Sequence, residues 1–408
     1  MTDSGEPLPV PAVSASPNTK LERTLGSGEP EEYGLALSGG GIRATLFHYG
    51  AILRINEMGH LQEIDRIAGV SGGAIAAGLL ARVWDDLEWE DGRATNLRKR
   101  LEPLVMRLAG MPLDIPIIVL GIIPFVSPAR LLASVLDRFF LRGLTLDQLP
   151  QERGVRPRFV FNASDLATGT LFRFSEPYMG TYKVGLVLKP KIKVAIAVAA
   201  SAAFPPFVAP LNLDMDPDDV IDPGGADLHG RTDLRKRAAL VDGGAYDNLA
   251  LEPITDRCHY YLVSDAGGNI SLKPPTWKWS LWTSLVLRTL DISVSQDRAL
   301  RRSALALTRA AHPYALWRTL TDPHGGKVPT PFEVQKDWPV YLSTRSTRLW
   351  PFSKSDRRWL VNWGYLTSDV LLRSWIWEGA APPTGLPFRD ATFEVPPPEV
   401  PDVAEKAD

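Results

Sequence analysis

The sequence predicts an α/β fold, with a central and mostly parallel sheet between helices and a helical extension at the C-terminus. A strand-like segment, Tyr33–Leu37, runs through a glycine loop into a helical pattern, and a second, Ile64–Val70, runs through the pentad Gly69–Gly73 into another. Repeated strand-helix alternation of this kind is typical of a parallel sheet flanked by helices. The 408 residues, 45% hydrophobic and 23% charged, suit one large globular domain or two ordinary ones.

The chain begins in polar sequence before the first strand. Residues 1–30 are rich in Pro, Ser, Gly and Glu without an apolar period, so we expect a disordered tail and a folded part that starts near Glu31. Helices are expected at Ala44–Met58, after the glycine loop, and at Gly73–Val83, after the pentad. A helical pattern over residues 93–141 is interrupted by the apolar, proline-bearing stretch Ile115–Val126.

Further strands and helices follow in the second half of the chain. We expect four strands, at Arg158–Ala163, Leu171–Phe174, Ala238–Val241 and His259–Ser264. Between the second and the third strand we expect an alanine-rich helix, Lys193–Ala203, and then a charged insertion, Asp214–Arg237. The last of these strands is predicted to close the sheet. Helical patterns at Trp277–Ala311 and Ser355–Glu378 predict that residues 266–395 form a helical extension packed on the core, and residues 396–408 form a polar tail.

Ser71 stands between glycines where the second strand turns into a helix. G-x-S-x-G at such a turn is typical of a nucleophile elbow, because Gly69 and Gly73 permit a strained backbone and the hydroxyl then projects from the sheet edge. Spacing alone is weak evidence, since a chain of this composition contains the pattern by chance in roughly one case in five. Two neighbouring motifs strengthen it: three consecutive glycines within Ser38–Arg43, and Asp-Gly-Gly within Val241–Asn248.

Glycine loop, serine elbow and Asp-Gly-Gly, in this order, resemble the patatin-like phospholipase family over roughly residues 33–265. Two softer matches, Asn162–Gly169 and Ala200–Pro206, lie between the second and third motifs. The resemblance implies the patatin-like three-layer sandwich, with residues 31–265 as its catalytic domain. It also implies that the serine works with the aspartate of Asp-Gly-Gly alone, which is Asp242 here, and that no metal or other cofactor is needed.

The identity of the general base separates two enzyme hypotheses. In a conventional triad a histidine takes the proton from the serine, and the chain order leaves only the late histidines His259, His312 and His324 as candidates. None of them has a supporting motif. In the patatin-like alternative the base is Asp242, whose pKa would be raised by burial towards a useful value. The neighbouring Asp247 is interpreted as structural.

Backbone amides of Gly39, Gly40 and Gly41 are the candidates for an oxyanion hole, because consecutive glycines before a helix can point several N–H groups at one place. A phosphate-binding loop is the competing interpretation, and neither of the usual phosphate-loop patterns is present here. Arg43 follows this loop and either holds it or lies near a phospholipid phosphate. Gly243 and Gly244 are predicted to support Asp242, and Asn248 is predicted to buttress its loop.

Composition limits the other functions open to the chain. A formal net charge of −2 gives no global attraction to nucleic acid, and the single cysteine, Cys258, excludes an internal disulfide framework. Residues 1–20 lack the apolar core of a signal peptide, so we expect a cytoplasmic protein. No segment reaches about 18 consecutive apolar residues. Peripheral membrane contact is therefore expected, through Ile115–Val126 or through the Trp277–Trp282 cluster with Lys273 and Lys278.

The sequence thus predicts a serine-dependent lipid acyl hydrolase that cuts carboxylic ester bonds of phospholipids or related acyl lipids. Two alternatives remain open: an esterase with a Ser-His-Asp triad, and a catalytically silent lipid-binding regulator. Some members of the family that this chain resembles are switched on by a partner or a small-molecule signal. We therefore also expect an activator.

Overall fold

The computed structural model describes residues 31–121, 123, 126–150, 157–268 and 282–398 of the chain. The predicted tails therefore lie outside the described residues, apart from 396–398. The strands are β1 (Glu31–Leu37), β2 (Ile64–Gly69), β3 (Trp89–Glu90), β4 (Arg93–Ala94), β5 (Arg158–Asp165), β6 (Thr170–Phe174), β7 (Tyr178–Thr181), β8 (Gly185–Leu188), β9 (Leu211–Asp214), β10 (Val220–Ile221), β11 (Arg237–Asp242), β12 (Cys258–Asp265) and β13 (Tyr314–Arg318).

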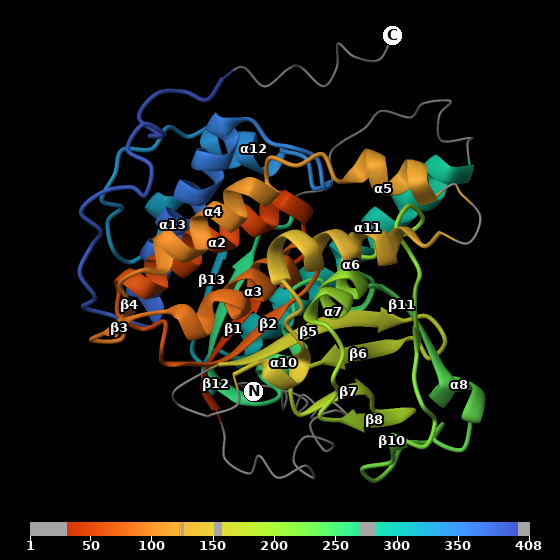
Figure 1. The fold of residues 1–408 in the computed structure, drawn as a ribbon. Coiled ribbons are helices and arrows are strands. Elements are labelled where there is room, and N and C mark those ends of the chain that lie inside the picture. The colour runs from red at the N-terminus through yellow and green to blue at the C-terminus, as the bar shows by residue number, and fades with distance from the viewer. Residues whose placement is uncertain (1–30, 122, 124–125, 151–156, 269–281, 399–408) are drawn as a thin grey trace, which may run out of the picture.

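The helices lie between and after these strands (Figure 1). They are α2 (Gly41–Glu57), α3 (Gly72–Val83), α4 (Leu97–Leu108), α5 (Asp114–Gly121), α6 (Pro128–Leu136), α7 (Val194–Ser201), α8 (Thr232–Lys236), α9 (Gly244–Asp247), α10 (Glu252–Thr255), α11 (Trp282–Thr308), α12 (Trp338–Ser343) and α13 (Lys354–Trp375). Short helical turns of other types occur at Trp84–Asp86, Asp137–Leu141, Leu146–Gln148 and Pro323–Gly325.

One large sheet organises the described part of the molecule. Its main strand order is β10-β8-β7-β6-β5-β2-β1-β12-β13, and β11 pairs with both β5 and β9 beside this path. Strands β5, β2, β1, β12 and β13 are neighbours in this order and pair in parallel. The remaining pairings are antiparallel. The predicted α/β fold with a mostly parallel centre is confirmed.

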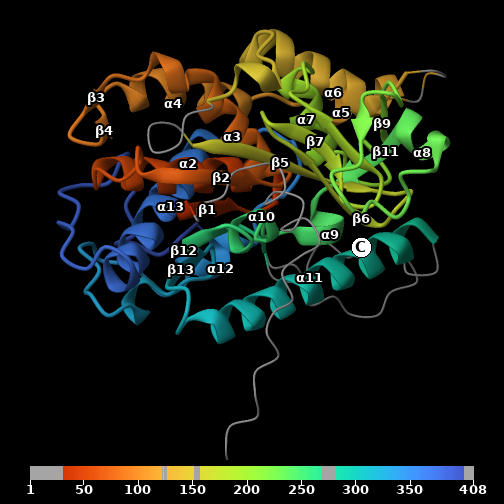
Figure 2. The ribbon, with the colours of Figure 1, turned by 90° about the horizontal axis from the view of Figure 1, so that it is seen from below.

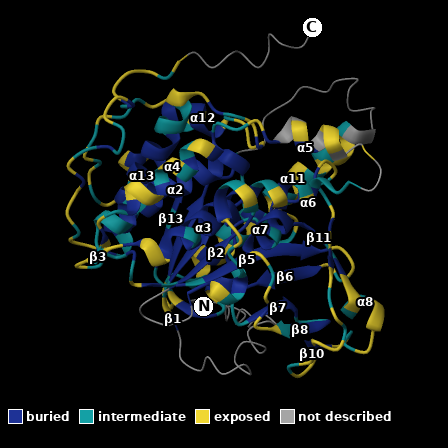
Figure 3. Cartoon of the chain, viewed as in Figure 1, coloured by how far each residue is buried: buried dark blue, intermediate teal, exposed yellow. Residues whose placement is uncertain are grey.

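Helices cover both faces of the parallel strands, which explains why these strands are apolar on both sides. On β1, Leu35 and Leu37 face the large core beneath α2, α3 and α13, and Ala36 faces a smaller core that includes Leu249, Ile254 and Leu305. Figure 2 shows the two layers, with α11 along one face and α3 and α7 on the other. The strands are mostly buried, while α5 and α8 carry many exposed residues (Figure 3).

The prediction that the strand at residues 259–264 closes the sheet is wrong. The edge strand is β13, which pairs in parallel with β12 from Tyr261↔Tyr314 to Asp265↔Arg318. The predicted long helices of this region correspond to α11 and α13, and α13 packs against α2 on the face of the large core. The C-terminal part of the chain therefore contributes a strand to the same sheet as well as helices.

The order of the strands brings the three sequence motifs to one place. Parallel strands β1 and β2 end side by side at Leu37↔Gly69, immediately before the glycine loop and before Ser71. Strand β5 is the other neighbour of β2, and the end of β11 pairs with it at Asp242↔Ala163. The carboxyl ends of adjacent parallel strands are the usual place for a site in an open α/β sheet.

Candidate active site

Ser71 lies at a sharp turn between β2 and α3. Its backbone has φ 52° and ψ −117°, a left-handed conformation that costs a non-glycine residue about 1–3 kcal/mol. The flanking glycines are required by close packing, because a Cβ on Gly69 would lie 2.6 Å from the carbonyl oxygen of Gly73. A Cβ on Gly73 would lie 2.1 Å from that of Leu37. The turn has the geometry of the predicted nucleophile elbow.

A serine that the sequence motifs did not single out holds this turn in place. The Ser71 backbone N–H donates to the Ser201 hydroxyl at 2.9 Å, and that hydroxyl donates to the carbonyl oxygen of Asn162 at 2.6 Å. Ser201 ends α7, within the softer match Ala200–Pro206. These two hydrogen bonds satisfy a buried donor and stabilise the strained backbone at Ser71.

Asp242 lies at the end of β11, and its carboxyl is close enough to the Ser71 side chain for the serine to lower its pKa. The residue is only 6% exposed, and its Oδ1 accepts the backbone N–H of Gly244 at 2.7 Å. Burial raises the pKa of the Asp242 carboxyl to about 6, against the lowering effects of the Gly244 N–H and of the nearby Ser71 side chain. A carboxylate with this pKa is a suitable general base near neutral pH.

The glycine loop contacts the serine turn directly. Gly40 has φ 143° and Gly41 has φ 59°, and a Cβ on Gly72 would lie 2.1 Å from the carbonyl oxygen of Gly41. The amides of Gly40 and Gly41 donate no hydrogen bond to any described residue, and Gly41 is the first residue of α2. Both N–H groups are thus available to an anion at a helix N-terminus.

Gly39 differs from the two glycines that follow it. Its backbone N–H donates to the carbonyl oxygen of Asn248 at 3.0 Å, so it is not free to bind an oxyanion. Of the three predicted donors, Gly40 and Gly41 are therefore the ones whose N–H groups are available in this structure. Gly72, the residue after Ser71, is a donor that sequence reasoning missed: it begins α3 and its N–H has no acceptor among the described residues.

Asn248 connects the glycine loop with the Asp242 loop. A Cβ on Gly39 would lie 2.2 Å from Asn248 Oδ1, and one on Gly244 would lie 2.6 Å from the same atom. Asp247 is fully buried: its carboxylate accepts the N–H groups of Leu249 and Glu252 and lies 3.4 Å from the Arg301 guanidinium. Asp247 therefore holds its own loop. Gly243 packs on the Asn162 carbonyl, where a Cβ would lie 2.2 Å from the oxygen.

Arg43 is buried behind the glycine loop, where it donates to three carbonyl oxygens. Its Nη2 reaches the carbonyl of Ala266 at 2.8 Å, and its Nη1 reaches those of Ser343 and Arg345 at 2.6 and 2.8 Å. Burial lowers the pKa of this guanidinium to about 10. Of the two roles predicted for Arg43, this geometry fits the one in which it holds the loop.

His48 is the histidine closest in structure to the glycine loop, and it is fully buried. Its Nε2 lies 2.9 Å from the Ser38 carbonyl oxygen and its Nδ1 lies 2.7 Å from the Ser264 hydroxyl. Burial lowers its pKa to about 4, so the ring is neutral at pH 7, and Nε2–H must donate to the carbonyl. Both ring nitrogens are occupied, which leaves His48 a role in positioning Ser38.

The late histidines lie away from Ser71. His259 is exposed at the start of β12, about 16 Å along the strand from Ser264, which is level with the end of β2. His312 stacks on Tyr261 and contacts His259, and His324 lies in an exposed turn. Among the described residues no histidine contacts Ser71 or Asp242, so the geometry speaks against the triad alternative.

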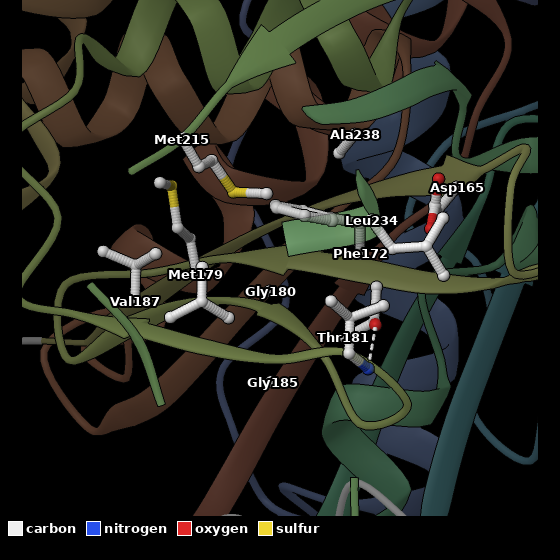
Figure 4. Close-up of a pocket in the computed structure, with 12 residues that line it drawn as sticks. Asp165, Phe172, Met179, Gly180, Thr181, Gly185, Val187, Met215, Leu234 and Ala238 are labelled. Carbon is white, nitrogen blue, oxygen red and sulfur yellow. Dashed lines mark hydrogen bonds between the residues drawn. The ribbon is translucent and has the colours of Figure 1, made fainter. Parts of the chain in front are cut away.

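A small cavity under the antiparallel strands is separate from this site. It lies among β6, β7, β8 and β11 and is lined by residues that include Asp165, Phe172, Met179 and Met215 (Figure 4). Its volume is about 10 Å³, which is room for about one water molecule. Asp165 itself caps the turn that follows β5, accepting hydrogen bonds from Ala167 and Thr168. This cavity is a packing void, too small for a substrate.

The stretch predicted to meet a membrane forms α5 and the residues after it. Val119, Leu120 and Ile123 are 56, 45 and 51% exposed, whereas Ile117 is buried. Of the second candidate cluster, Trp277, Trp279 and both lysines lie outside the described residues, and Trp282 begins α11. None of the helices in the described ranges is long and apolar enough to cross a membrane.

Fold and site together define an α/β protein with a nucleophile elbow, and comparison with protein families gives its class. The model of the patatin-like phospholipase family matches residues 35–254, more than half of the chain. The protein belongs to the patatin-like phospholipase family, as the three motifs predicted. No curated protein matches the sequence.

Several solved structures are similar to this chain at low identity. Human GIVD cytosolic phospholipase A2 in complex with methyl γ-linolenyl fluorophosphonate shares 13% identity, with a TM-score of 0.46 over 87% of this chain and 60% of that one. VipD from Legionella pneumophila shares 15% identity, with a TM-score of 0.39 over 85% and 67%. ExoU from Pseudomonas aeruginosa, solved with SpcU, shares 16% identity, with a TM-score of 0.27 over 67% and 53%. The chain spans about half to three fifths of the cytosolic phospholipase A2 chains it matches.

Proposed function

We propose that the protein is a phospholipase A-type lipid acyl hydrolase that uses Ser71 and Asp242 as a catalytic dyad. The observation that carries the proposal is the placement of the buried Asp242 carboxyl, whose pKa is raised to about 6, beside the strained turn at Ser71. Family membership supports the lipid class of the substrate.

In the proposed reaction Asp242 accepts the hydroxyl proton while Ser71 Oγ attacks the acyl carbonyl carbon. The carbonyl oxygen becomes an oxyanion, and the free amides of Gly40 and Gly41, with Gly72 beside them, donate hydrogen bonds to it. Collapse of this intermediate breaks the ester bond, and Asp242 returns the proton to the leaving alcohol. The acyl group stays on Ser71 Oγ.

Water completes the cycle. Asp242 takes a proton from the water as its oxygen attacks the acyl-enzyme, and the resulting oxyanion occupies the same donors. When the acyl–Oγ bond breaks, the proton passes from Asp242 to Ser71, and a free fatty acid leaves. The base ends each half-reaction as a carboxylate, so one residue serves both steps.

Access to lipid is proposed to come from peripheral contact with a bilayer through α5 and the residue that follows it. The support is the exposure of Val119, Leu120 and Ile123, an apolar group on a surface helix.

The proposal is tested by measuring fatty-acid release from a panel of phospholipids and neutral lipids, together with covalent labelling by a fluorophosphonate probe. We expect wild-type protein to release fatty acid and to be labelled, and Ser71→Ala to do neither while melting normally. A wild-type protein that binds lipid vesicles without any labelling would instead fit a silent lipid-binding regulator.

A further inference from the structure

A second hollow lies at the edge of the sheet, between α11, β13 and α13. It is an open cleft of about 560 Å³, and its lining includes Arg302, Arg309, Tyr314, Arg318, Leu371 and Trp375. Neither Ser71 nor Asp242 lines it. All of its lining residues lie beyond residues 35–254, so the cleft is built by the part of the chain that the family model does not match.

Arg318 is a half-buried cation that forms no ion pair within the described part of the chain. Its backbone N–H donates to the Thr321 hydroxyl, but its guanidinium makes no hydrogen bond or ion pair with any described residue. Burial lowers the pKa of Arg318, and the charges of Arg302 and Arg298 add to this effect, against the attraction of Asp265. Nearby positive charges thus destabilise the charged form of the Arg318 guanidinium. A bound anion would offset this repulsion.

Arg309 is the second cation of the cleft without a carboxylate partner in the described chain. Its guanidinium carbon lies 3.9 Å from the centre of the Tyr314 ring and 4.3 Å from that of Trp375. Lys327 lies over the same Trp375 ring, with its Nζ 3.8 Å from the ring centre. Stacking on the rings orients Arg309 and leaves its N–H groups available to a ligand.

Two carboxylates lie near the cleft, and they are fewer than its arginines. Asp265 is fully buried and is shared by Arg298 at 2.7 Å and Arg302 at 3.0 Å. Asp322 lines the cleft, but its carboxylate accepts the backbone N–H of His324 and caps the turn that follows. The arginines of the cleft therefore outnumber the carboxylates that face them.

We propose that this cleft binds an organic phosphate. A phosphate or diphosphate group would be held by Arg302, Arg309 and Arg318, since guanidinium groups match phosphate oxygens in bidentate geometry and several of them favour a multiply charged anion. The organic part would lie against Leu316, Leu320 and Leu371, which also line the cleft. A phospholipid headgroup and a soluble phosphate ester both present this chemistry. The proposal stands independently of the hydrolase activity.

Titration calorimetry on the full-length chain tests the proposal, with inorganic phosphate and phenyl phosphate as probes. We expect both to bind, phenyl phosphate more tightly because of the apolar wall, and both more weakly as salt is added. Arg318→Gln should weaken binding by about tenfold or more, and Arg318→Lys by less, because lysine keeps the charge but loses the bidentate geometry. The matched control is Arg100→Gln, at an exposed arginine of α4, which should bind like wild type.

Vesicle sedimentation distinguishes the two sources of the phosphate. Retention on phosphatidylcholine vesicles that contain phosphatidic acid, lost in Arg318→Gln, would assign the cleft to a lipid headgroup. Binding of the soluble probes without such retention would assign it to a soluble ester. Should Arg318→Gln fail to melt cooperatively, Arg309→Gln replaces it. Absence of binding by both probes and vesicles, or equal weakening in Arg100→Gln, would overturn the proposal.

Discussion

Replacing the proposed base by its neutral isostere, Asp242→Asn, should stabilise the protein while it abolishes activity. The carboxyl has an ordinary pKa of 3.8 and a folded pKa of about 6, so the folded state binds its proton more tightly than the unfolded state. Stability is therefore lost as pH rises from about 4 to about 6, and it stays lower above that range. Asparagine does not titrate and escapes this loss.

The size of the effect follows from the same shift. A difference of about 2 pKa units corresponds to about 3 kcal/mol, which Asp242→Asn should recover at pH 8 and should not recover below about pH 4. For a folded part of this size, that gain raises the melting temperature by about 3 to 4 °C. Thermal melting monitored by circular dichroism, repeated from pH 4 to pH 8, measures it.

Asp247→Asn provides the matched control within the same loop. Its carboxylate accepts N–H groups from Leu249 and Glu252 and lies near Arg301, so an amide there places an N–H donor against another donor. This variant should lose about 1–3 kcal/mol. Two results would refute the reasoning that ionised, buried Asp242 destabilises the fold at pH 8. One is a melting temperature of Asp242→Asn below that of wild type at pH 8, and the other is a gain in melting temperature that does not change with pH.

Four further outcomes are expected. The kcat/KM of the wild type should fall about tenfold between pH 7 and pH 5, because only about a tenth of Asp242 is ionised one unit below a pKa of about 6; a flat acid limb would exclude this base. Gly40→Ala should lower turnover by about a hundredfold or more, since a φ of 143° disfavours a side chain and the N–H donor would be misaimed; near-normal turnover would place the oxyanion hole elsewhere. Single alanine replacements of His259, His312 and His324 should keep turnover within about tenfold, and a folded but inactive variant would restore the triad. Val119→Asp with Ile123→Asp should reduce hydrolysis of bilayer lipid but spare a short-chain p-nitrophenyl ester, whereas Val340→Asp, at an equally exposed valine of α12, should change neither; equal loss on both substrates would assign α5 to the core.

Local sequence signals were sufficient for the elbow and for the order of the motifs. The strand-turn-helix pattern around Ser71 and the glycine loop before α2 depend on residues that are adjacent in the chain, so pattern and spacing predict them. The proposed partnership of Asp242 with Ser71 is different. It follows from resemblance to a family, because the sequence around residue 242 does not indicate which strands this segment will pair with.

Features that depend on tertiary contact were missed or mistaken. The sequence does not distinguish Gly39 from the two glycines after it, whereas in the structure the carbonyl oxygen of Asn248 accepts the Gly39 N–H. Ser201 reaches the Ser71 amide from α7, across a separation of 130 residues. Strand β13 is five residues long within sequence that is mainly helical, and pairing with β12, rather than its own pattern, makes it a strand.

A double-mutant comparison tests the central claim, that Ser71 and Asp242 act as one proton-transfer unit, most directly. The measurement is kcat/KM on one phospholipid for wild type, Ser71→Ala, Asp242→Asn and the double variant, each with its melting temperature. We expect each single change to remove about three or more orders of magnitude, and the double variant to be scarcely worse than either. Losses that add, or an Asp242→Asn variant that retains wild-type turnover, would contradict the dyad.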